Sequence, residues 1–386
     1  MSSDKAKNRS VLIVSNCTWY LYNFRKELIS KLSDQGYYLI LVSPLDNYYK
    51  RLEKYFNSKE NLFLNRGSEN PFLEIITIFN LLFIYIKYRP DLVHHFTIKP
   101  CLYGGTIARF LGIKSIINHI TGLGPSFFSK RVKINYINKI LKPIYKYAFN
   151  RKYNIVNIFH NNSDRDTFIS KNITSKKNSK VIYGSGVDID YFVKEKKQRV
   201  KNRIKKVLFP ARIIKEKGIV ELIYACEELW NENYKFILNI AGEIDTQNKS
   251  HINKKDFEYL IRNKNISFLG KCNNMPEIYR NMDIVVLPSW REGLSKTLLE
   301  AAAMSMPIIT TNVPGCRDII KNNFSGLVVT LKSKDKLKSA LKILLNDNKL
   351  ATKLGRNARK IVSEKYEVQN INNQILKVYN KFLKVR

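Results

Sequence analysis

Cysteine is scarce in this chain. Its 386 residues include only five, and no two of them have Cys-x-x-Cys spacing: Cys17, Cys101, Cys226, Cys272 and Cys316. An odd number of scattered cysteines argues against a disulfide framework and against a cysteine zinc site. The pattern is typical of a protein from a reducing compartment, so we expect a cytoplasmic location.

Long apolar runs are also lacking. The first run, residues 11–14, is ended by Ser15 and Asn16 and is too short for the apolar region of a signal peptide. The longest run, residues 75–86, has 12 residues and contains Thr77 and Asn80. We therefore expect it to be too short to span a bilayer.

Acidic residues are few, and this leaves a large positive charge. Asp and Glu number 32 against 67 Lys and Arg, giving a net charge of +35. Such a charge favours anionic partners, namely nucleic acid, acidic phospholipid or phosphorylated substrates. A general bias of composition toward Lys, Asn and Ile would produce the same charge without any such partner, and both interpretations stay open here.

Alternating strand and helix patterns fill both halves of the chain. Strands are predicted at residues 11–14, 38–42, 92–96, 116–117, 207–210, 236–241, 266–269 and 284–287, with helices at 24–35 and 73–88. Repeated units of this kind predict an α/β protein with parallel sheets, in which ligands bind at the carboxyl ends of the strands. The length suits two domains, with a boundary after Asp188 and a basic linker or exposed edge at residues 194–206.

One stretch, residues 283–302, combines a buried strand with a candidate anion site. The apolar run 284–287 ends at Pro288 and Ser289, Glu292 and Gly293 make a turn, and a helix is predicted over 294–303. The start of a helix offers free N–H groups and a positive dipole end to an anion such as phosphate. Glu300 lies roughly 12 Å further along the helix, so Glu292 and Glu300 could hold hydroxyl groups at two places on one long ligand. Without this context they would be two solvated glutamates on a surface helix.

In this context the chain resembles the family 4 glycosyltransferases of the GT-B fold, whose signature is a Glu, seven residues and a second Glu. The resemblance continues through residues 307–311 and 314–318. It implies an α/β protein of two Rossmann-like domains with an interdomain cleft. Residues 1–188 would form the acceptor-binding domain, completed by a helix at 368–386, and residues 189–367 would form the nucleotide-sugar-binding domain.

The resemblance also implies roles for charged residues of the second domain. Arg212 and Lys217, which precedes Gly218, match the family's Arg…Lys-Gly motif and would bind the donor diphosphate and offset its charge. Lys215 is the weaker candidate for the lysine of the motif. Glu300 would accept hydrogen bonds from the ribose hydroxyls, and Glu292 would contact the transferred sugar. Taken alone, the two basic residues could be exposed bases in a chain rich in them.

Backbone groups complete the implied donor site. The N–H groups of Gly293, Leu294 and Ser295 would contact phosphate or sugar. Gly242 and Glu243 match a glycine-rich turn near the nucleotide, with Glu243 where a smaller residue is frequent. Ser305 stands where many members have glycine.

Four stretches on the acceptor side carry a second likeness: residues 22–25, 70–71, 95–100 with 103–104, and 121–124. In them the chain resembles a subgroup that transfers sugars to polyprenyl-diphosphate-linked saccharides. The loop after the first strand lacks the Gly-Gly pair of many relatives. Lys99 is a candidate for an acceptor phosphate. His94 and His95 are adjacent in a strand, so at most one faces the site. His119 either touches the donor or is a plain loop histidine. The acceptor-side candidates are Asn16, His95, Lys99, His119, Thr121 and Gly122.

Residues 130–152 form a basic segment with interleaved apolar residues. It has eight Lys or Arg and no acidic residue. Such a segment suits an anionic membrane surface, and it equally suits an ordinary surface helix packed on the sheet.

A metal is not expected. Asp188, Ile189 and Asp190 could be an Asp-x-Asp metal motif, but with Gly186, Val187 and Phe192 they resemble the domain-end turn of family 4. No cofactor is expected beyond the nucleotide-sugar substrate.

The resemblance therefore implies a metal-independent, retaining transferase that moves a sugar, an N-acetylhexosamine by likeness to the subgroup, from a UDP-sugar to a polyprenyl-diphosphate-linked saccharide. It would work at the cytoplasmic face of a membrane in surface polysaccharide or glycan synthesis. A glycosyltransferase with a soluble acceptor is one alternative. A basic nucleic-acid-binding protein is another, although no recognition motif for nucleic acid is identified.

Overall fold

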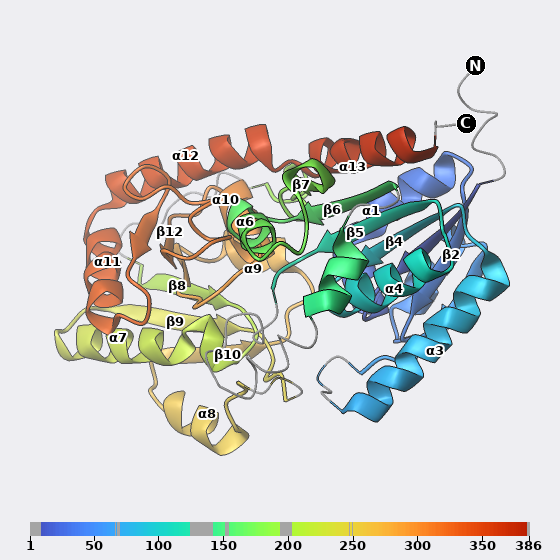
Figure 1. Cartoon of the computed structure of the whole chain (residues 1–386). Coiled ribbons are helices and arrows are strands. Elements are labelled where there is room, and N and C mark those ends of the chain that lie inside the picture. The colour runs from blue at the N-terminus through green and yellow to red at the C-terminus, as the bar shows by residue number, and fades with distance from the viewer. Residues whose placement is uncertain are drawn as a thin grey trace. The chain divides into compact units, whose positions relative to one another are not determined.

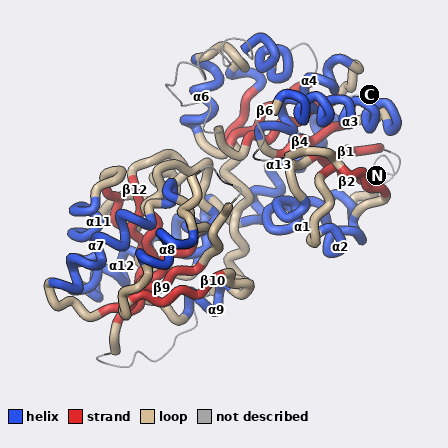
Figure 2. Tube along the Cα trace, turned by 90° about the horizontal axis from the view of Figure 1, so that it is seen from below, coloured by secondary structure: helices blue, strands red, loops and turns tan. Residues whose placement is uncertain are grey.

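The chain folds into two compact units, Met1–Ser185 with Asn372–Arg386, and Gly186–Ile371. The computed structural model describes residues 9–65, 67, 70–123, 142–150, 154–193, 203–246, 248 and 250–383. The units begin and end a few residues from the predicted divisions after 188 and 367. In each unit a sheet is flanked by helices, as Figures 1 and 2 show.

The sheet of the first unit is entirely parallel. Its order is β3-β2-β1-β4-β5-β6-β7. Most of its central residues are buried, as expected when helices cover both faces of a parallel sheet. The strands are β1 (Ser10–Val14), β2 (Tyr38–Ser43), β3 (Ser58–Asn61), β4 (Leu92–Phe96), β5 (Ser115–Ile120), β6 (Asn154–Phe159) and β7 (Ser179–Val181).

Helices of the first unit cover this sheet. They are α1 (Thr18–Asp34), α2 (Tyr49–Leu52), α3 (Pro71–Tyr88), α4 (Ile98–Phe110) and α6 (Asn162–Ser170), with 3-10 turns η1 (Glu53–Tyr55) and η3 (Lys176–Asn178). α3 follows the local rules of its sequence. The Asn70 side chain accepts from the N–H of Phe72, Pro71 occupies the first turn, and Arg89 adopts a left-handed conformation at the end.

The second unit has a six-stranded parallel sheet of order β10-β9-β8-β11-β12-β13. Its strands are β8 (Lys205–Pro210), β9 (Phe236–Ala241), β10 (Ile266–Gly270), β11 (Ile284–Leu287), β12 (Ile308–Thr311) and β13 (Leu327–Val329). Its helices are η4 (Lys215–Lys217), α7 (Ile219–Asn231), α8 (Lys254–Leu260), α9 (Met275–Arg280), α10 (Lys296–Ala303), α11 (Lys334–Asn346) and α12 (Asn348–Lys365). β9 and β11 flank β8, so the chain reverses direction across the sheet between β8 and β11. Ligands of such sheets bind at this switch point.

The last helix, α13 (Val368–Leu383), supplies residues from Asn372 onward to the first unit. The Tyr379 hydroxyl lies 2.8 Å from Nδ1 of His94 on β4, and both side chains are fully buried. The C-terminal segment is thus part of the core of the first unit.

Several predicted boundaries are wrong. α1 spans Thr18–Asp34 and not 24–35, so most of the loop expected after the first strand is helical. β8 begins at Lys205, inside the expected basic linker, and residues 194–202 lie outside the described residues. α10 begins at Lys296 because Ser295 is its N-cap, with its hydroxyl accepting from the Leu298 N–H.

The basic segment at 130–152 falls largely outside the described residues. Within it, residues 142–149 are helical. Ala148 and Phe149 of that helix are fully buried and pack against Phe168 and Ile173. This described part is a helix packed on the first unit.

α3 corrects the expectation for the apolar run 75–86. The helix has 18 residues and is long and apolar enough to cross a membrane by length and composition alone. The apolar run forms only the middle of this helix, which also includes Pro71–Glu74 before it and Lys87–Tyr88 after it.

Candidate active site

The loops that follow β8 and β11 touch in the second unit, at the switch point of the sheet. Gly218 ends the 3-10 turn η4 with φ +74°, and a Cβ added there would lie 2.2 Å from the carbonyl oxygen of Pro288. Only glycine allows both this backbone conformation and this close approach. The Lys-Gly pair of the sequence motif is therefore held directly against the end of β11.

Lys217 and Glu292 form an ion pair at this contact. Their side chains are only 16% and 12% exposed, and the Ser289 hydroxyl donates to the same Glu292 oxygen at 2.8 Å. The backbone oxygen of Ser289 accepts from the Thr311 hydroxyl at the end of β12. Two residues predicted from separate motifs, 75 positions apart, thus share one hydrogen-bonded cluster. Ser289 was missed as a member, although the Pro-Ser end of the strand marked its position.

The loop after β12 closes over the Glu-Gly turn. Gly315 has φ +77°, and an added Cβ would lie 2.7 Å from the carbonyl oxygens of Glu292 and Gly293. The Gly315 oxygen accepts from the N–H of Ser295 at 3.3 Å. The prediction that the Ser295 N–H contacts a ligand is therefore wrong for this structure, because that donor already has a backbone partner. Leu294 and Gly293 lie in the same turn, directly before the cap.

Glu300 lies on α10 and is partly buried. The Tyr279 hydroxyl of α9 donates toward its Oε2 at 3.4 Å and toward the Thr297 carbonyl oxygen at 3.2 Å. Burial raises the pKa of Glu300, and the charge of Lys296 and the Tyr279 hydrogen bond oppose that rise. Tyr279, fully buried, was not predicted, because nothing in the local sequence of α9 points toward α10.

Arg212 has a partner that the sequence did not reveal. It forms an ion pair with Asp245, and its side chain remains about half exposed. Gly242 holds the two loops together, since an added Cβ would lie 1.9 Å from the Ala211 carbonyl oxygen. Glu243 accepts the N–H of Ile213 through its backbone oxygen at 2.8 Å, while its carboxylate pairs with Lys271 at 3.4 Å. Glu243 thus shapes the loop through its backbone rather than its side chain.

Two acceptor-side predictions in the first unit are wrong because of burial. His95 is fully buried, with Nδ1 2.7 Å from Oδ1 of Asn118 and Nε2 2.7 Å from the Tyr85 hydroxyl. Gly104 leaves room for this ring, since an added Cβ would lie 2.5 Å from Nε2. His95 is therefore a core histidine with both ring nitrogens paired, and His94 on the other side of the strand is equally buried.

His119 is not a loop histidine either. It belongs to β5, is fully buried, and places Nε2 3.2 Å from the Arg25 guanidinium and 3.2 Å from Nε2 of His160. Arg25 also donates to the carbonyl oxygen of Gly184. In the part of the chain that the structure describes, no Asp or Glu pairs with Arg25. His119 thus belongs to a buried cluster with Arg25 and His160 that no local pattern indicated.

The remaining acceptor-side candidates lie at the carboxyl ends of the neighbouring strands β1, β4 and β5. Asn16 follows β1, and Thr121 and Gly122 follow β5. Lys99, in the first turn of α4, forms an ion pair of 2.6 Å with Glu74 and donates to the Asn65 carbonyl oxygen at 3.0 Å. In this structure the charge of Lys99 is therefore paired with a carboxylate.

Asp188 and Asp190 show turn geometry. Oδ1 of Asp188 accepts from the N–H groups of Asp190 and Tyr191 at 3.0 and 2.8 Å. Across the described residues, no three His, Cys, Asp or Glu side chains gather in a group that could hold a metal ion.

Two models of known protein families match this chain. Residues 191–361 match the model of the glycosyl transferases group 1, and residues 10–161 match that of the glycosyl transferase 4-like domain. The chain is a glycosyltransferase of the GT-B fold. Family models and curated relatives both describe transferases, so the nucleic-acid alternative loses its support.

Curated relatives are similar over nearly their whole length. The capsular polysaccharide biosynthesis glycosyltransferase CapM of Staphylococcus aureus is 28% identical over 87% of this chain and 88% of its own. The N,N'-diacetylbacillosaminyl-diphospho-undecaprenol alpha-1,3-N-acetylgalactosaminyltransferase of Campylobacter jejuni is 25% identical over 94% of this chain and 96% of its own.

Solved structures show the same fold. Anabaena Alr3699/HepE, solved with UDP and glucose, matches with a TM-score of 0.78 at 17% identity, over 97% of this glycosyltransferase and 100% of its own chain. WaaG, involved in lipopolysaccharide biosynthesis, matches with a TM-score of 0.72 at 13% identity, over 96% and 99% of the two chains. At these identities the likeness concerns the fold alone.

Proposed function

We propose that this glycosyltransferase moves an N-acetylhexosamine from a UDP-sugar to a polyprenyl-diphosphate-linked saccharide, with retention at the anomeric carbon. The observation that carries the donor half is the Lys217–Glu292 pair at the switch point between β8 and β11. The acceptor half is supported by relatives whose names specify diphospho-undecaprenol-linked saccharides, two of them with N-acetylgalactosaminyl and one with galactosyl transfer.

The proposed chemistry follows from the charges at the site. Lys217 and Arg212 would stabilise the negative charge that develops on the leaving diphosphate as the anomeric C–O bond breaks. Glu292 would hold Lys217 in place and accept hydrogen bonds from the transferred sugar. The new bond forms from the acceptor hydroxyl on the same face, and its proton passes to the departing phosphate oxygen, so no side-chain base is required.

The setting follows from the acceptor. A polyprenyl-linked saccharide is held in a membrane, while nucleotide sugars are cytoplasmic, so the enzyme would act peripherally at the cytoplasmic face in surface polysaccharide or glycan synthesis. No metal or cofactor takes part in the proposed reaction.

Glu300→Ala is expected to lower kcat/KM for transfer by about 100-fold, because a charged acceptor of two hydroxyl hydrogen bonds is lost. The assay measures label from a panel of UDP-sugars entering a butanol-extractable polyprenyl-diphosphate saccharide. Glu364→Ala on α12, an exposed glutamate, is the matched control and should retain full activity. Release of UDP with labelled soluble sugar, and no label in the lipid phase, would replace the proposed acceptor by a soluble one.

Asp245→Asn is expected to lower KM for the UDP-sugar about threefold, because the exposed Arg212 ion pair competes with the donor diphosphate for the same guanidinium. Initial rates against donor concentration measure it. Glu243→Gln on the same loop is the control, since its carboxylate pairs with Lys271 instead. A higher KM in Asp245→Asn would show that the carboxylate positions Arg212 rather than competing for it.

A further inference from the structure

The outer face of α3 carries an exposed apolar stripe. Its residues recur at intervals of three and four, which places them on one side of a helix. Their exposed fractions run from 45% to 77%, although every one is a large hydrophobic residue: Phe72, Ile75, Ile76, Phe79, Phe83 and Ile86. A continuous apolar surface of this kind indicates an interaction site rather than chance exposure.

The opposite face of α3 fixes the helix to the first unit. Thr77, Leu81, Ile84 and Tyr85 are buried, and the last three belong to the core cluster beneath the sheet. α3 lies outside α4 in Figure 1, and the two helices are in contact. α3 has the length of a membrane span. Crossing a bilayer would, however, remove Tyr85 from its hydrogen bond with His95 and this face from the core.

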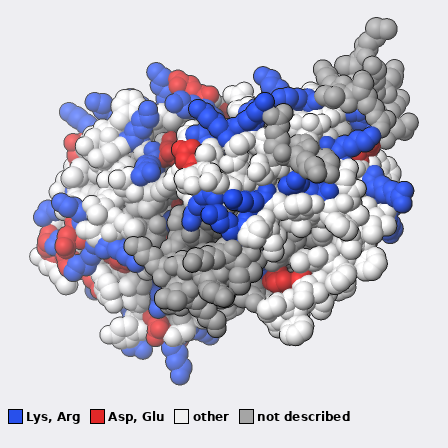
Figure 3. Space-filling view, viewed as in Figure 1, with Lys and Arg blue, Asp and Glu red and all other residues white. Residues whose placement is uncertain are grey.

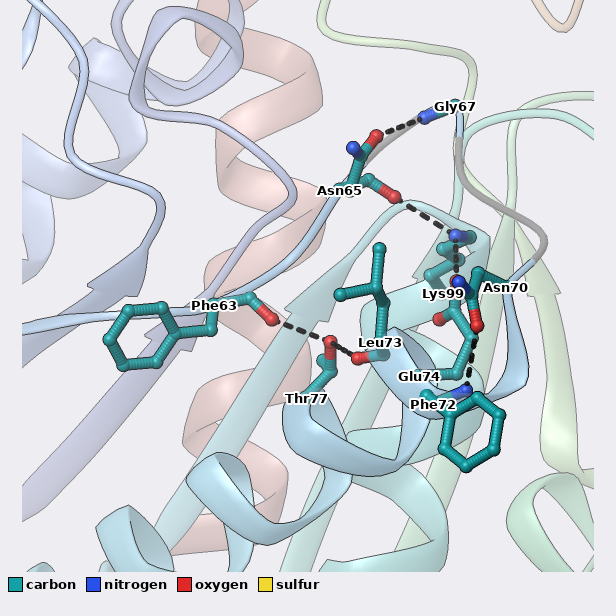
Figure 4. Close-up of polar contacts among 9 residues, drawn as sticks. All are labelled: Phe63, Asn65, Gly67, Asn70, Phe72, Leu73, Glu74, Thr77 and Lys99. Carbon is teal, nitrogen blue, oxygen red and sulfur yellow. Dashed lines mark hydrogen bonds and ion pairs between the residues drawn. The ribbon is translucent and has the colours of Figure 1, made fainter.

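Two polar side chains of α3, those of Glu74 and Thr77, bond to neighbouring elements of the first unit (Figure 4). The Thr77 hydroxyl lies 2.5 Å from the carbonyl oxygen of Phe63 and 3.0 Å from that of Leu73. Glu74, the single charged residue between Pro71 and Ile86, pairs with Lys99 at 2.6 Å. Oδ1 of Asn80 accepts from the Phe63 N–H at 3.1 Å. The stripe can therefore enter an apolar phase without desolvating a charge.

Positive charge adjoins the stripe at its C-terminal end. Lys87 and Arg89 are both exposed there, with Lys87 sharing its charge with Glu60 at 2.7 Å. In the space-filling view the surface over α3 is almost wholly uncharged (Figure 3). An apolar helix face bordered by basic residues, on a chain of net charge +35, complements the hydrocarbon edge and anionic headgroups of a lipid surface.

We propose that α3 docks this enzyme on an anionic membrane by lying in the interface plane with its outer stripe inserted. The inference deepens the proposed function and rests on it for the identity of the membrane. A second copy of the chain is the competing occupant of the stripe. The adjoining positive charge disfavours it, because the basic residues of two copies would repel each other.

The test is co-sedimentation of the full chain with vesicles of phosphatidylglycerol and phosphatidylcholine, compared with phosphatidylcholine alone. The variant Phe72→Gln/Phe79→Gln/Phe83→Gln removes three exposed side chains and should lower the partition coefficient by about 1000-fold, at roughly tenfold for each ring withdrawn. The matched control, Phe110→Gln/Tyr259→Gln/Phe324→Gln, removes three comparably exposed rings from other elements and should bind like the wild type. In Phe83→Trp the added tryptophan emission should shift to the blue on vesicles, whereas in Phe110→Trp it should not.

Other outcomes overturn the proposal. Equal vesicle binding by both triple variants, or none by the wild type, shows that α3 is not the docking face. A wild-type dimer that the α3 variant converts to a monomer, without vesicle binding, assigns the stripe to self-association. Transfer to a water-soluble short-chain acceptor separates the docking proposal from the proposed function. If the α3 triple variant is active on that acceptor and binds vesicles like the wild type, only the docking proposal is rejected. Vesicle binding through α3 without transfer to any lipid-linked acceptor rejects only the proposed function.

Discussion

Replacing Lys217 with alanine is expected to lower kcat for sugar transfer about a thousandfold while the fold survives. Removing one preorganised charge from a site where negative charge develops has an effect of this size. Lys217 is the best-placed cation of the second unit for this role, because Gly218 presses its loop against β11 and Glu292 holds its Nζ.

The fold should tolerate this change because Lys217 lies in a short surface turn rather than in the core. Glu292 keeps the Ser289 hydroxyl as a partner after the substitution. Circular dichroism and the thermal midpoint should therefore stay near those of the wild type.

Lys215→Ala is the matched control, two residues earlier in the same 3-10 turn. Lys215 precedes no glycine and has no side-chain bond to the Glu-Gly turn among the contacts described. Its variant should keep nearly normal kcat. Near-normal kcat in Lys217→Ala, with Lys215→Ala impaired, would show that Lys215 and not Lys217 is the lysine that acts in transfer.

Lowering the pH from about 7 to about 5 is expected to reduce the free energy of unfolding by several kcal/mol. Four of the five histidines lie in the core of the first unit, and burial holds the pKa of each below its usual range: His94, His95, His119 and His160. For His95 the pKa falls to about 4. The buried Arg25 charge further lowers the pKa of the other three.

The direction of this pH dependence follows from the lowered pKa values of the four histidines. Below about pH 6.5 the histidines of the unfolded chain bind protons, whereas those of the folded chain stay neutral. The stabilisation they give is therefore fully present above that pH and is lost as the pH falls. Each histidine that stays neutral in the fold contributes about 2 kcal/mol over this range. The sum is a large part of the 5–15 kcal/mol typical of a domain.

Urea unfolding of the first unit, followed at several pH values, measures this effect. His160→Gln should reduce the slope of stability against pH by about one proton, or roughly 1.4 kcal/mol per pH unit below pH 6. His251→Gln, at an exposed position, should leave the slope unchanged. A stability that is flat from pH 7 to 5 would mean that the cluster around Arg25 is already protonated or hydrated in the folded state.

Much of the fold was readable from the chain. Strands β4, β9 and β11 begin and end at the predicted residues. β11 is an unbroken apolar run, as suits a strand buried on both faces, whereas β4 contains His94 and His95 and β9 contains Asn239. The family resemblance assigned Lys217 and Glu292 to one donor site, but their ion pair was not predicted, because the sequence does not show that β8 and β11 are neighbours. Asp245 and Tyr279 were not predicted either, since the residues they contact lie on other loops and helices.

The sequence by itself determined the α/β class, the two-unit organisation, the donor-side motifs and the glycosyltransferase resemblance, since these depend on local runs, turns and spacing. Only the tertiary structure decided which polar residues remain available to bind a ligand. It buried His95 and His119 through packing by α1, α3 and α4, and it paired the Ser295 N–H with the Gly315 carbonyl oxygen. It also decided which face of α3 is exposed. That helix is apolar nearly all round, so its periodicity alone does not separate an inner face from an outer one, and the packing of Tyr85 and Leu81 on the core does.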